Sequence, residues 1–189
     1  MKIGLYFGSF NPVHIAHLII ANHILNETKI EKIWFIVSPQ NPFKTDSDLL
    51  NEYQRLQLVQ LATENDTRIE SPAIEFNLPK PSYTADTLNY LAEKYPDHEF
   101  CILMGSDSFQ NLDKWKNYEA IIKNYPVYVY IREGFPIENN IGADLHIVDA
   151  PRLQLSATLL RKYIREGKSI RYMVPDKVLE EIVKGKYYK

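Results

Sequence analysis

Short apolar runs that alternate with helical patterns constrain the fold of this chain more than any other feature of its sequence. Residues 2–8 and 33–37 read as strands, and each is followed by a loop and then by a helix-like pattern. Further strands are expected at residues 100–104, 127–131 and 145–148. Strands that alternate with helices predict a doubly wound α/β fold, in which a mostly parallel sheet has helices on both faces.

The helical patterns complete one domain and indicate where ligands bind. They cover residues 15–25, 52–62, 85–95 and 118–123, and two more at 158–165 and 174–183 form a small C-terminal helical segment. Because 189 residues without a linker-like stretch suit one folding unit, residues 1–189 are predicted to form a single domain. Ligands of such sheets bind beyond the carboxyl ends of the strands. The loops after Phe7, Val37 and Met104 are therefore expected to surround the site.

The composition argues against several classes of partner. A net charge of -2 disfavours a dedicated nucleic-acid binder, which needs a concentrated excess of lysine and arginine. The chain has no run of the ~20 apolar residues that a membrane span requires. Its single cysteine, Cys101, precludes an intrachain disulfide. We therefore expect a cytoplasmic protein with no nucleic-acid or membrane partner, and the sequence leaves open whether it forms a homo-oligomer.

The first motif with chemical content is GSFNPVHIAH, residues 8–17. Gly8 ends the first predicted strand, Ser9 and Phe10 offer main-chain N–H groups, and His14 and His17 lie near one face at the start of a helix. A helix amino terminus favours anions, and histidines there can donate to phosphate oxygens. Two histidines alone are more often caps or surface residues, but the whole strand, loop and pair predict a phosphate site. The spacing of the two histidines does not match a zinc site, so no protein-bound metal is expected. The sequence also has neither a P-loop nor a GxGxxG pattern.

The second motif is LSATLLRKYI, residues 155–164. Ser156 is suited to capping a helix, Thr158 adds a hydroxyl group, and Arg161 is suited to donating to a phosphate through both arms of its guanidinium. A serine before an amphipathic helix usually means only a cap. In combination with the first motif, it predicts a second group of phosphate donors.

Both motifs resemble the signature of the nucleotidyltransferase superfamily that includes the adenylyltransferases of NAD and coenzyme A synthesis. The resemblance covers both ends of the chain, although Ala16 stands where the first motif usually has glycine. It implies a Rossmann-like fold and a Mg²⁺ ion held mainly through the phosphates of ATP. The residues that it implies for ATP binding are Gly8, Ser9, Phe10, His14, His17, Gly105, Asp107, Ser156, Thr158 and Arg161.

The middle of the chain resembles the bacterial nicotinate mononucleotide adenylyltransferase branch. The segments concerned are PKPSYTADTL at 79–88, MGSD at 104–107 and LDKW at 112–115. The resemblance implies that main-chain N–H groups of Ser82, Tyr83 and Thr84 bind the nicotinate carboxylate and that Trp115 stacks on the pyridine ring. Trp115 has the alternative role of a core anchor. Asp107 is expected either to orient a ribose hydroxyl or to cap the short helix that follows.

A third stretch, NPFK at residues 41–44, corresponds to a P-P-H-K stretch of that branch. Phe43 replaces its usual histidine, while Lys44 is retained as an expected phosphate contact and substrate-binding residue. Lys116 also departs from the branch, because an aromatic residue often follows the tryptophan. The residues expected to act in catalysis are His14, His17, Lys44 and Arg161.

The resemblance implies adenylyl transfer from ATP to nicotinate mononucleotide, with release of pyrophosphate and formation of nicotinate adenine dinucleotide. A phosphate monoester is largely ionised near pH 7 because its second pKa is about 6, so no general base is required. Two alternatives remain open. One is an adenylyltransferase for nicotinamide mononucleotide or another small phosphate, and the other is a nucleotide-sensing module without turnover.

Overall fold

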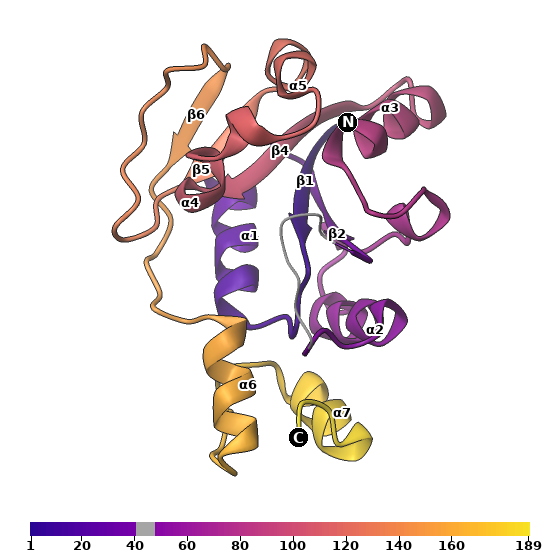
Figure 1. The fold of residues 1–189 in the computed structure, drawn as a ribbon, viewed down its shortest axis with the longest axis vertical. Helices are drawn as coiled ribbons and strands as arrows, with labels where there is room; N and C mark the ends of the chain where they lie inside the picture. Colours follow the sequence, from indigo (N-terminus) through magenta and orange to yellow (C-terminus); the bar gives the residue numbers. More distant parts are fainter. Residues whose placement is uncertain (41–47) are drawn as a thin grey trace.

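The structure, a computed structural model that describes residues 1–40 and 48–189, is built on a six-stranded sheet (Figure 1). The strands are β1 (Lys2–Gly8), β2 (Lys32–Val37), β3 (Ile69–Glu70), β4 (Glu99–Gly105), β5 (Val127–Tyr130) and β6 (Leu145–Val148). Every pairing in this sheet is parallel, and the order is β3-β2-β1-β4-β5-β6. This is the strand order of a Rossmann fold, so the predicted fold class is confirmed.

Helices connect the strands at the predicted places. They are α1 (Ile15–Glu27), α2 (Glu52–Thr63), α3 (Thr84–Lys94), α4 (Ser106–Phe109), α5 (Tyr118–Asn124), α6 (Ala157–Arg165) and α7 (Asp176–Gly185), with 3-10 turns η1 (Glu75–Asn77) and η2 (Leu112–Lys114). Three predicted elements extend past the observed ones. The fifth strand ends at Tyr130, α3 ends at Lys94 because Tyr95 is its C-cap, and the last helix begins at Asp176 because Pro175 is its extended N-cap. Three further elements, β3, η1 and η2, were not predicted because they are too short to show a period. A short helix was expected after Asp107, but α4 begins at Ser106 with Gly105 as its N-cap, so Asp107 lies within the helix and does not cap it.

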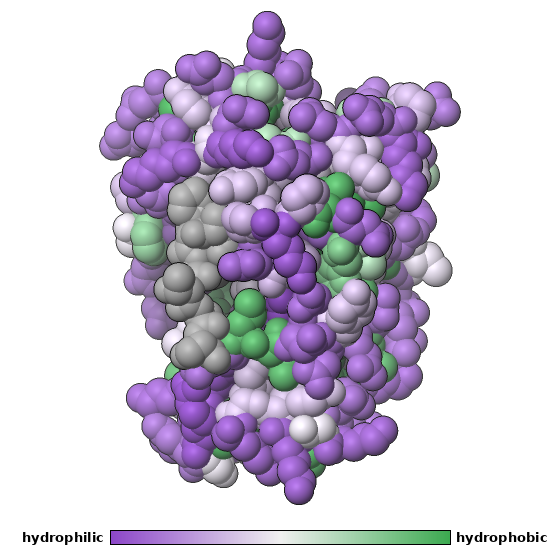
Figure 2. Space-filling view, turned by 45° about the vertical axis from the view of Figure 1, so that its right-hand side comes forward, coloured by the Kyte–Doolittle hydropathy of each residue, from purple (hydrophilic) through white to green (hydrophobic). Residues whose placement is uncertain are grey.

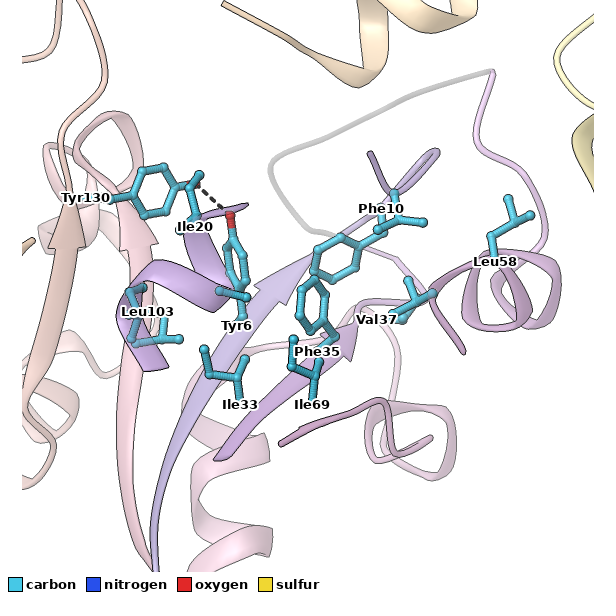
Figure 3. Close-up of a cluster of buried hydrophobic side chains, with 14 of the residues drawn as sticks. Tyr6, Phe10, Ile20, Ile33, Phe35, Val37, Leu58, Ile69, Leu103 and Tyr130 are labelled. Atoms are coloured by element: carbon cyan, nitrogen blue, oxygen red, sulfur yellow. Dashed lines mark hydrogen bonds between the residues drawn. The ribbon is translucent and has the colours of Figure 1, made fainter. Parts of the chain in front are cut away.

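Side chains alternate between the two faces of the sheet and build a core on each face. On one face, Tyr6, Phe35 and Leu103 pack with apolar residues of α1, α2, α6 and α7, in the cluster that Figure 3 shows in part. On the other face, Leu5 and Ile102 pack with residues of α3, α4 and α5. Each fully buried side chain of this size contributes about 1.5–3 kcal/mol to stability. The two cores hold the strand ends in place around the site.

The C-terminal helices extend the first core at one end of the molecule, where Figure 1 shows α6 and α7 together. Ser156 caps α6, because its Oγ accepts the main-chain N–H of Leu159 at 3.2 Å. Val178 and Ile182 of α7 are buried in the core that contains α2. The predicted C-terminal helical segment is therefore confirmed, and its packing fixes the start of α6 beside the sheet.

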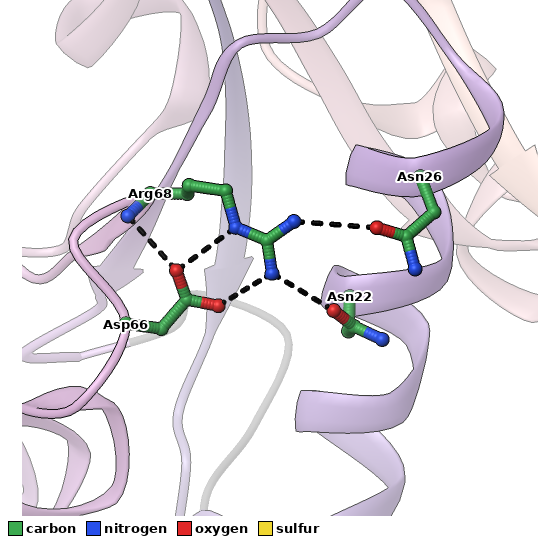
Figure 4. Close-up of polar contacts among 4 residues, drawn as sticks. All are labelled: Asn22, Asn26, Asp66 and Arg68. Atoms are coloured by element: carbon green, nitrogen blue, oxygen red, sulfur yellow. Dashed lines mark hydrogen bonds and ion pairs between the residues drawn. The ribbon is translucent and has the colours of Figure 1, made fainter.

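A polar network on the surface ties α1 to the turn before β3 (Figure 4). The guanidinium of Arg68 bonds to both carboxylate oxygens of Asp66, at 3.0 and 2.7 Å, and to the side chains of Asn22 and Asn26, at 2.9 and 3.2 Å. Exposed pairs of this kind contribute little to stability. Hydrophilic side chains dominate the face in Figure 2. Across residues 1–40 and 48–189, no helix has the length and apolarity needed to cross a membrane.

Candidate active site

Two adjoining pockets open where the strand order reverses, between β1 and β4. β1 leads into α1 on one face of the sheet and β4 leads to α4 and α5 on the other, which leaves a crevice beyond the strand ends. The larger pocket has a volume of about 800 Å³ and the smaller one about 160 Å³. Their shared lining consists of Tyr6, Phe7, Gly8, Ser9, Ser108 and Tyr130. Ligands filling both pockets would therefore meet beside the end of β1.

The loop after β1 is shaped by the side chain of Phe10. Phe10 has a φ of 44°, which is uncommon for a residue with a side chain. Its ring is buried and packs on Tyr6 and Phe35, with centroids 5.8 and 5.1 Å away (Figure 3). Gly8 makes room for this ring, because a Cβ there would lie 2.9 Å from it. Any contact of Phe10 with a phosphate must therefore come from its main chain.

His14 and His17 both line the larger pocket, at the start of α1. Their rings stack with centroids 3.7 Å apart and planes inclined by 21°. The main-chain N–H of His14 donates to Nδ1 of His17 at 3.2 Å, so the proton of a neutral His17 is on Nε2. Burial, and then the charge of Arg132, lower the pKa of His14 from 6.5 to about 4. The site therefore presents a neutral His14 at pH 7.

The second motif reaches the same pocket from the other end of the chain. Ser156, Thr158 and Arg161 all line the larger pocket. Nη1 of the buried Arg161 donates to the carbonyl oxygen of Asn11 at 2.9 Å, a contact between residues 150 positions apart in the sequence. The structure therefore brings the two predicted motifs together, with Arg161 positioned by the loop that leads from β1 into α1.

The short helix α4, which begins directly after β4, places Asp107 in the wall of the larger pocket beside Arg132. The Arg132 guanidinium lies 3.4 Å from Oδ2 of Asp107, and the Arg132 main-chain N–H donates to Oγ of Ser106 at 2.9 Å. Gly105 lines the smaller pocket rather than the larger one. A Cβ at residue 105 would clash with the Asp107 carboxylate and lie 2.9 Å from Cδ of Arg132, so this close approach requires glycine.

Arg132 is a cationic residue of the larger pocket that the sequence analysis missed. It follows Ile131 directly after β5, at the same edge of the sheet as the loops after β1 and β4. Its charge acts on His14, and its side chain is 41% exposed in the pocket wall. The signal that could have found it is its place at the carboxyl end of a strand, where ligands of such sheets bind.

The smaller pocket gathers the residues predicted for the second substrate. Ser82, Tyr83, Thr84 and Trp115 all line it. Tyr83 is the N-cap of α3 and Thr84 its first residue, and the first N–H groups of a helix have no acceptor within the helix. Trp115 lines the pocket and also packs against the core under α3 and α5. Its position is therefore compatible with both roles considered for this tryptophan.

Lys116, the departure from the branch pattern, contacts the smaller pocket as well. Its Nζ lies 4.6 Å from the centroid of the Tyr83 ring and 2.9 Å from Oδ2 of Asp86. A lysine over a tyrosine ring makes a cation–π contact. The usual aromatic residue is thus replaced by a side chain that still packs on the start of α3.

Two predicted positions, Lys44 and Phe43, lie outside the described residues. The segments on either side of them are held by Asn11 and Arg55. Asn11 donates to the carbonyl oxygen of Asp48 and accepts the N–H of Leu50, both at 3.1 Å. The second motif and the segment that follows residue 47 are thus both tied to the loop after β1.

Arg55 is the largest fully buried side chain of the described structure, and sequence analysis missed it. Its guanidinium donates to carbonyl oxygens in the loops after β1 and β2 and at the start of α2. The acceptors are Ser9 at 2.6 Å, Pro39 at 3.0 Å, Ser38 at 2.9 Å and Leu50 at 2.7 Å. One side chain therefore joins the loop after β1, which borders both pockets, to the loop after β2, which borders the smaller one.

In the part of the chain that the structure describes, no group of three or more His, Cys, Asp or Glu side chains is arranged to hold a metal ion. The larger pocket instead combines imidazole and guanidinium donors with two carboxylates, those of Asp107 and Glu133. Such a lining suits a polyanionic ligand such as a phosphate chain.

Comparison with known proteins assigns the family. Residues 5–163 match the cytidylyltransferase-like family. The chain is 49% identical to a probable nicotinate-nucleotide adenylyltransferase of Flavobacterium johnsoniae, with 100% of each chain covered. It is 46% identical to one of Cytophaga hutchinsonii, with 100% of this chain and 98% of the relative covered. The chain belongs to the cytidylyltransferase-like family, among the nicotinate-nucleotide adenylyltransferases.

Solved structures share the fold of this member of the nicotinate-nucleotide adenylyltransferases. A nicotinic acid mononucleotide adenylyltransferase of Plasmodium falciparum complexed with NaAD has a TM-score of 0.85, with 99% of this chain and 97% of that chain covered. A structure of the same protein complexed with APC has a TM-score of 0.83. Both are 21% identical in sequence to this chain, and the likeness extends the fold assignment to the C-terminal helices.

Proposed function

We propose that this chain transfers the adenylyl group of ATP to nicotinate mononucleotide, giving nicotinate adenine dinucleotide and pyrophosphate in the biosynthesis of NAD. The observation that carries the proposal is the pair of adjoining pockets, one lined by phosphate donors and the other by a helix start and Trp115. The names of relatives that are 40–49% identical agree with this reaction. NaAD, the ligand complexed with the Plasmodium falciparum protein, is the product expected here.

In this proposal the larger pocket binds ATP. His14, His17 and Arg161 donate to its phosphates, and the first motif approaches them through the main chain of Ser9 and Phe10. Asp107 orients a ribose hydroxyl. Ser156 and Thr158 complete the phosphate side, and Lys44 is proposed as a further contact to the departing pyrophosphate. These roles rest on the lining of the pocket and on the motifs together.

The smaller pocket then binds the pyridine ring of nicotinate mononucleotide. The N–H groups at the start of α3 would receive its carboxylate, since a helix amino terminus favours an anion. Trp115 would stack on the ring, which is planar and cationic. Because both pockets share Gly8 and Ser9, the phosphate of one substrate meets the α-phosphate of the other at that wall.

The chemistry then requires alignment and charge stabilisation rather than proton abstraction. The attacking phosphate oxygen is already ionised near pH 7, because its second pKa is about 6. The site holds it in line with the α-phosphate and stabilises negative charge on the leaving pyrophosphate. Nε2–H of His17 is the donor best defined for this role. Magnesium enters as part of the substrate, bound mainly to the ATP phosphates.

A direct assay tests the proposal. Protein mixed with ATP, Mg²⁺ and nicotinate mononucleotide should release pyrophosphate and form an equal amount of nicotinate adenine dinucleotide. Omission of the mononucleotide should abolish the release. ATP binding without any dinucleotide would instead support the sensing module considered above. We further propose that residues 1–189 act as one nucleotidyltransferase domain and that the reaction takes place in the cytoplasm.

A further inference from the structure

A buried carboxyl group, Glu75, lines the smaller pocket beside the first turn of α3. Glu75 is 1% exposed. Its Oε1 accepts a hydrogen bond from Oγ1 of Thr87 at 2.8 Å, whereas Oε2 is buried and has no hydrogen-bond partner in the described part of the chain. The hydroxyl group of Ser82, on the same wall, lies near enough to lower the Glu75 pKa, but its buried oxygen is outside hydrogen-bond geometry with any described residue. The hydrogen bonding of this carboxyl group is therefore incomplete without a proton or a ligand.

The surroundings of Glu75 offer little compensation for a negative charge. Among the described residues it forms no ion pair, and Lys116, the cationic residue on the pocket wall, is paired with Asp86 at 2.9 Å. Burial raises the pKa of the Glu75 carboxyl. The hydroxyl groups of Thr87, Ser38 and Ser82 offset this rise only in part. The other titratable side chains on the wall are Tyr6, Tyr83 and Tyr130. Burial raises the pKa of Tyr6 and of Tyr130, so neither supplies a charge near neutrality.

The proposed substrate brings a second carboxylate to this place. The N–H groups that would receive the nicotinate carboxylate start the same helical turn whose Thr87 holds Glu75. Both carboxyl groups would then lie beside the first turn of α3, within the same pocket of about 160 Å³. Two carboxylates that share a buried site do not both remain ionised, because each disfavours the charge on the other. Nicotinamide mononucleotide has a neutral amide in place of the carboxylate, so its binding does not disfavour the charge on Glu75.

We propose, on the basis of the function proposed above, that Glu75 takes up a proton from solvent at Oε2 when nicotinate mononucleotide binds, and that the protonation state of Glu75 sets how strongly the acid is preferred over the amide at a given pH. The protonated carboxyl group donates a hydrogen bond toward the nicotinate carboxylate or Ser82. The ionised group repels the acid and accepts a hydrogen bond from the NH₂ of the amide. Glu75 is thus a specificity-determining residue whose charge opposes the substrate that the N-terminus of α3 attracts.

The first test follows the ratio of kcat/KM for nicotinate mononucleotide to kcat/KM for nicotinamide mononucleotide between pH 6 and pH 9. Both ligands share the phosphate and the ring, so a titration that changes both kcat/KM values equally does not change their ratio. The ratio therefore reports only groups that interact with the carboxylate. In the parent protein the ratio should fall about tenfold per pH unit between the Glu75 pKa of the free protein and that of the acid complex. Glu75→Gln, which is neutral at every pH, should give a flat ratio.

Glu93→Gln is the matched control, because it removes an exposed carboxylate from α3 outside the pocket. It should keep the pH dependence of the parent. A ratio that does not change with pH in the parent, or one that changes equally in the Glu75→Gln variant, would overturn the proposal. Lack of turnover with either mononucleotide would count against the proposed function itself. A change in the ratio tests only the role of Glu75.

A second measurement needs neither a variant nor turnover. Calorimetric titration of the parent protein with nicotinate mononucleotide, in buffers of different ionisation enthalpy, measures protons bound on complex formation. Uptake should approach one proton per site between the two pKa values, and titration with nicotinamide mononucleotide should show none beyond that of the shared phosphate. Equal uptake with the two ligands across pH 6 to 9 would contradict the proposal, even if Glu75→Gln failed to fold.

Discussion

The imidazole rings of His14 and His17 stack 3.7 Å apart, and the main-chain N–H of His14 donates to Nδ1 of His17. Two rings at this distance are not both cationic, because like charges disfavour each other in a partly buried site. The contact also leaves Nε2 of His17 as its proton-bearing nitrogen. In the proposed mechanism His14 is therefore a neutral donor whose main chain orients His17, and His17 is the stronger candidate for the transition-state donor.

The first prediction concerns that donor. His17→Ala should lower kcat on the order of 10²-fold or more and weaken ATP binding far less, because the donor acts on charge that develops during transfer. His17→Gln, which can place an N–H near the position of Nε2, should recover more of the rate than His17→Asn. Steady-state kinetics and ATP titrations check both comparisons. Parent-like turnover in His17→Ala at saturating substrate would remove His17 from the mechanism.

The second prediction links His14 to stability at acidic pH. Its pKa is about 4 in the folded protein, against 6.5 as its ordinary value, so the unfolded chain binds more protons between these values. The folded state should have its full stability above about pH 6.5 and lose up to about 3 kcal/mol from this residue as the pH falls to about 4. Urea unfolding at pH 7, 5.5 and 4.5 measures the loss.

The variant His14→Gln should reduce that loss, because a neutral side chain binds no proton when the chain unfolds. His23→Gln removes an imidazole elsewhere on α1 and should not reproduce the change. If the parent and His14→Gln lose the same stability between pH 7 and pH 4.5, the burial of a neutral His14 is refuted.

The third prediction concerns Arg55, which joins the loops after β1 and β2 through main-chain carbonyl oxygens. Arg55→Met keeps the length of the side chain but leaves several buried acceptors without donors. The expected loss of stability is at least ~3 kcal/mol, at about 1–3 kcal/mol for each unsatisfied group. Arg68→Met is the comparison, since Arg68 makes as many hydrogen bonds on the surface (Figure 4) and should matter much less. Similar losses in denaturant for the two variants would contradict this assignment.

The fourth prediction separates stacking from recognition of the carboxylate. Trp115→Ala should raise KM for both nicotinate and nicotinamide mononucleotides, because ring stacking is common to the two ligands. The ratio of their kcat/KM values should stay close to that of the parent, since the start of α3 is unchanged. Unfolding of the variant in denaturant reports any loss of core packing. If only stability falls and KM is unaltered, Trp115 is a core residue and not a ring-binding one.

The long elements of the fold were predictable from sequence because they carry a period. The seven-residue runs of β1 and β4 and the helical pattern of α2 repeat apolar residues often enough to be recognised. β3 has two residues and α4 has four, so neither shows a repeat. Their formation depends on neighbours: β3 exists because it pairs with β2, and α4 because the chain turns at Gly105.

The residues of the site also fall into two groups, those that the sequence reveals and those that only the packing reveals. His14, His17, Ser156 and Arg161 stand in local motifs whose spacing is visible in the sequence. Arg55, Arg132 and Glu75 do not, because an arginine on a helix and a glutamate in a loop usually face water. Only the packing of the elements shows that Arg132 and Glu75 border the pockets and that Arg55 joins the loops beside them.

The most direct test of the account is the parent protein's kcat/KM for nicotinate mononucleotide and for nicotinamide mononucleotide, each measured with saturating ATP and Mg²⁺ at pH 6.5. The account predicts dinucleotide formation from both, with the acid preferred at least ~tenfold, because the amide leaves a main-chain donor at the start of α3 poorly matched. Equal values, a preference for the amide, or pyrophosphate release without a dinucleotide would contradict it.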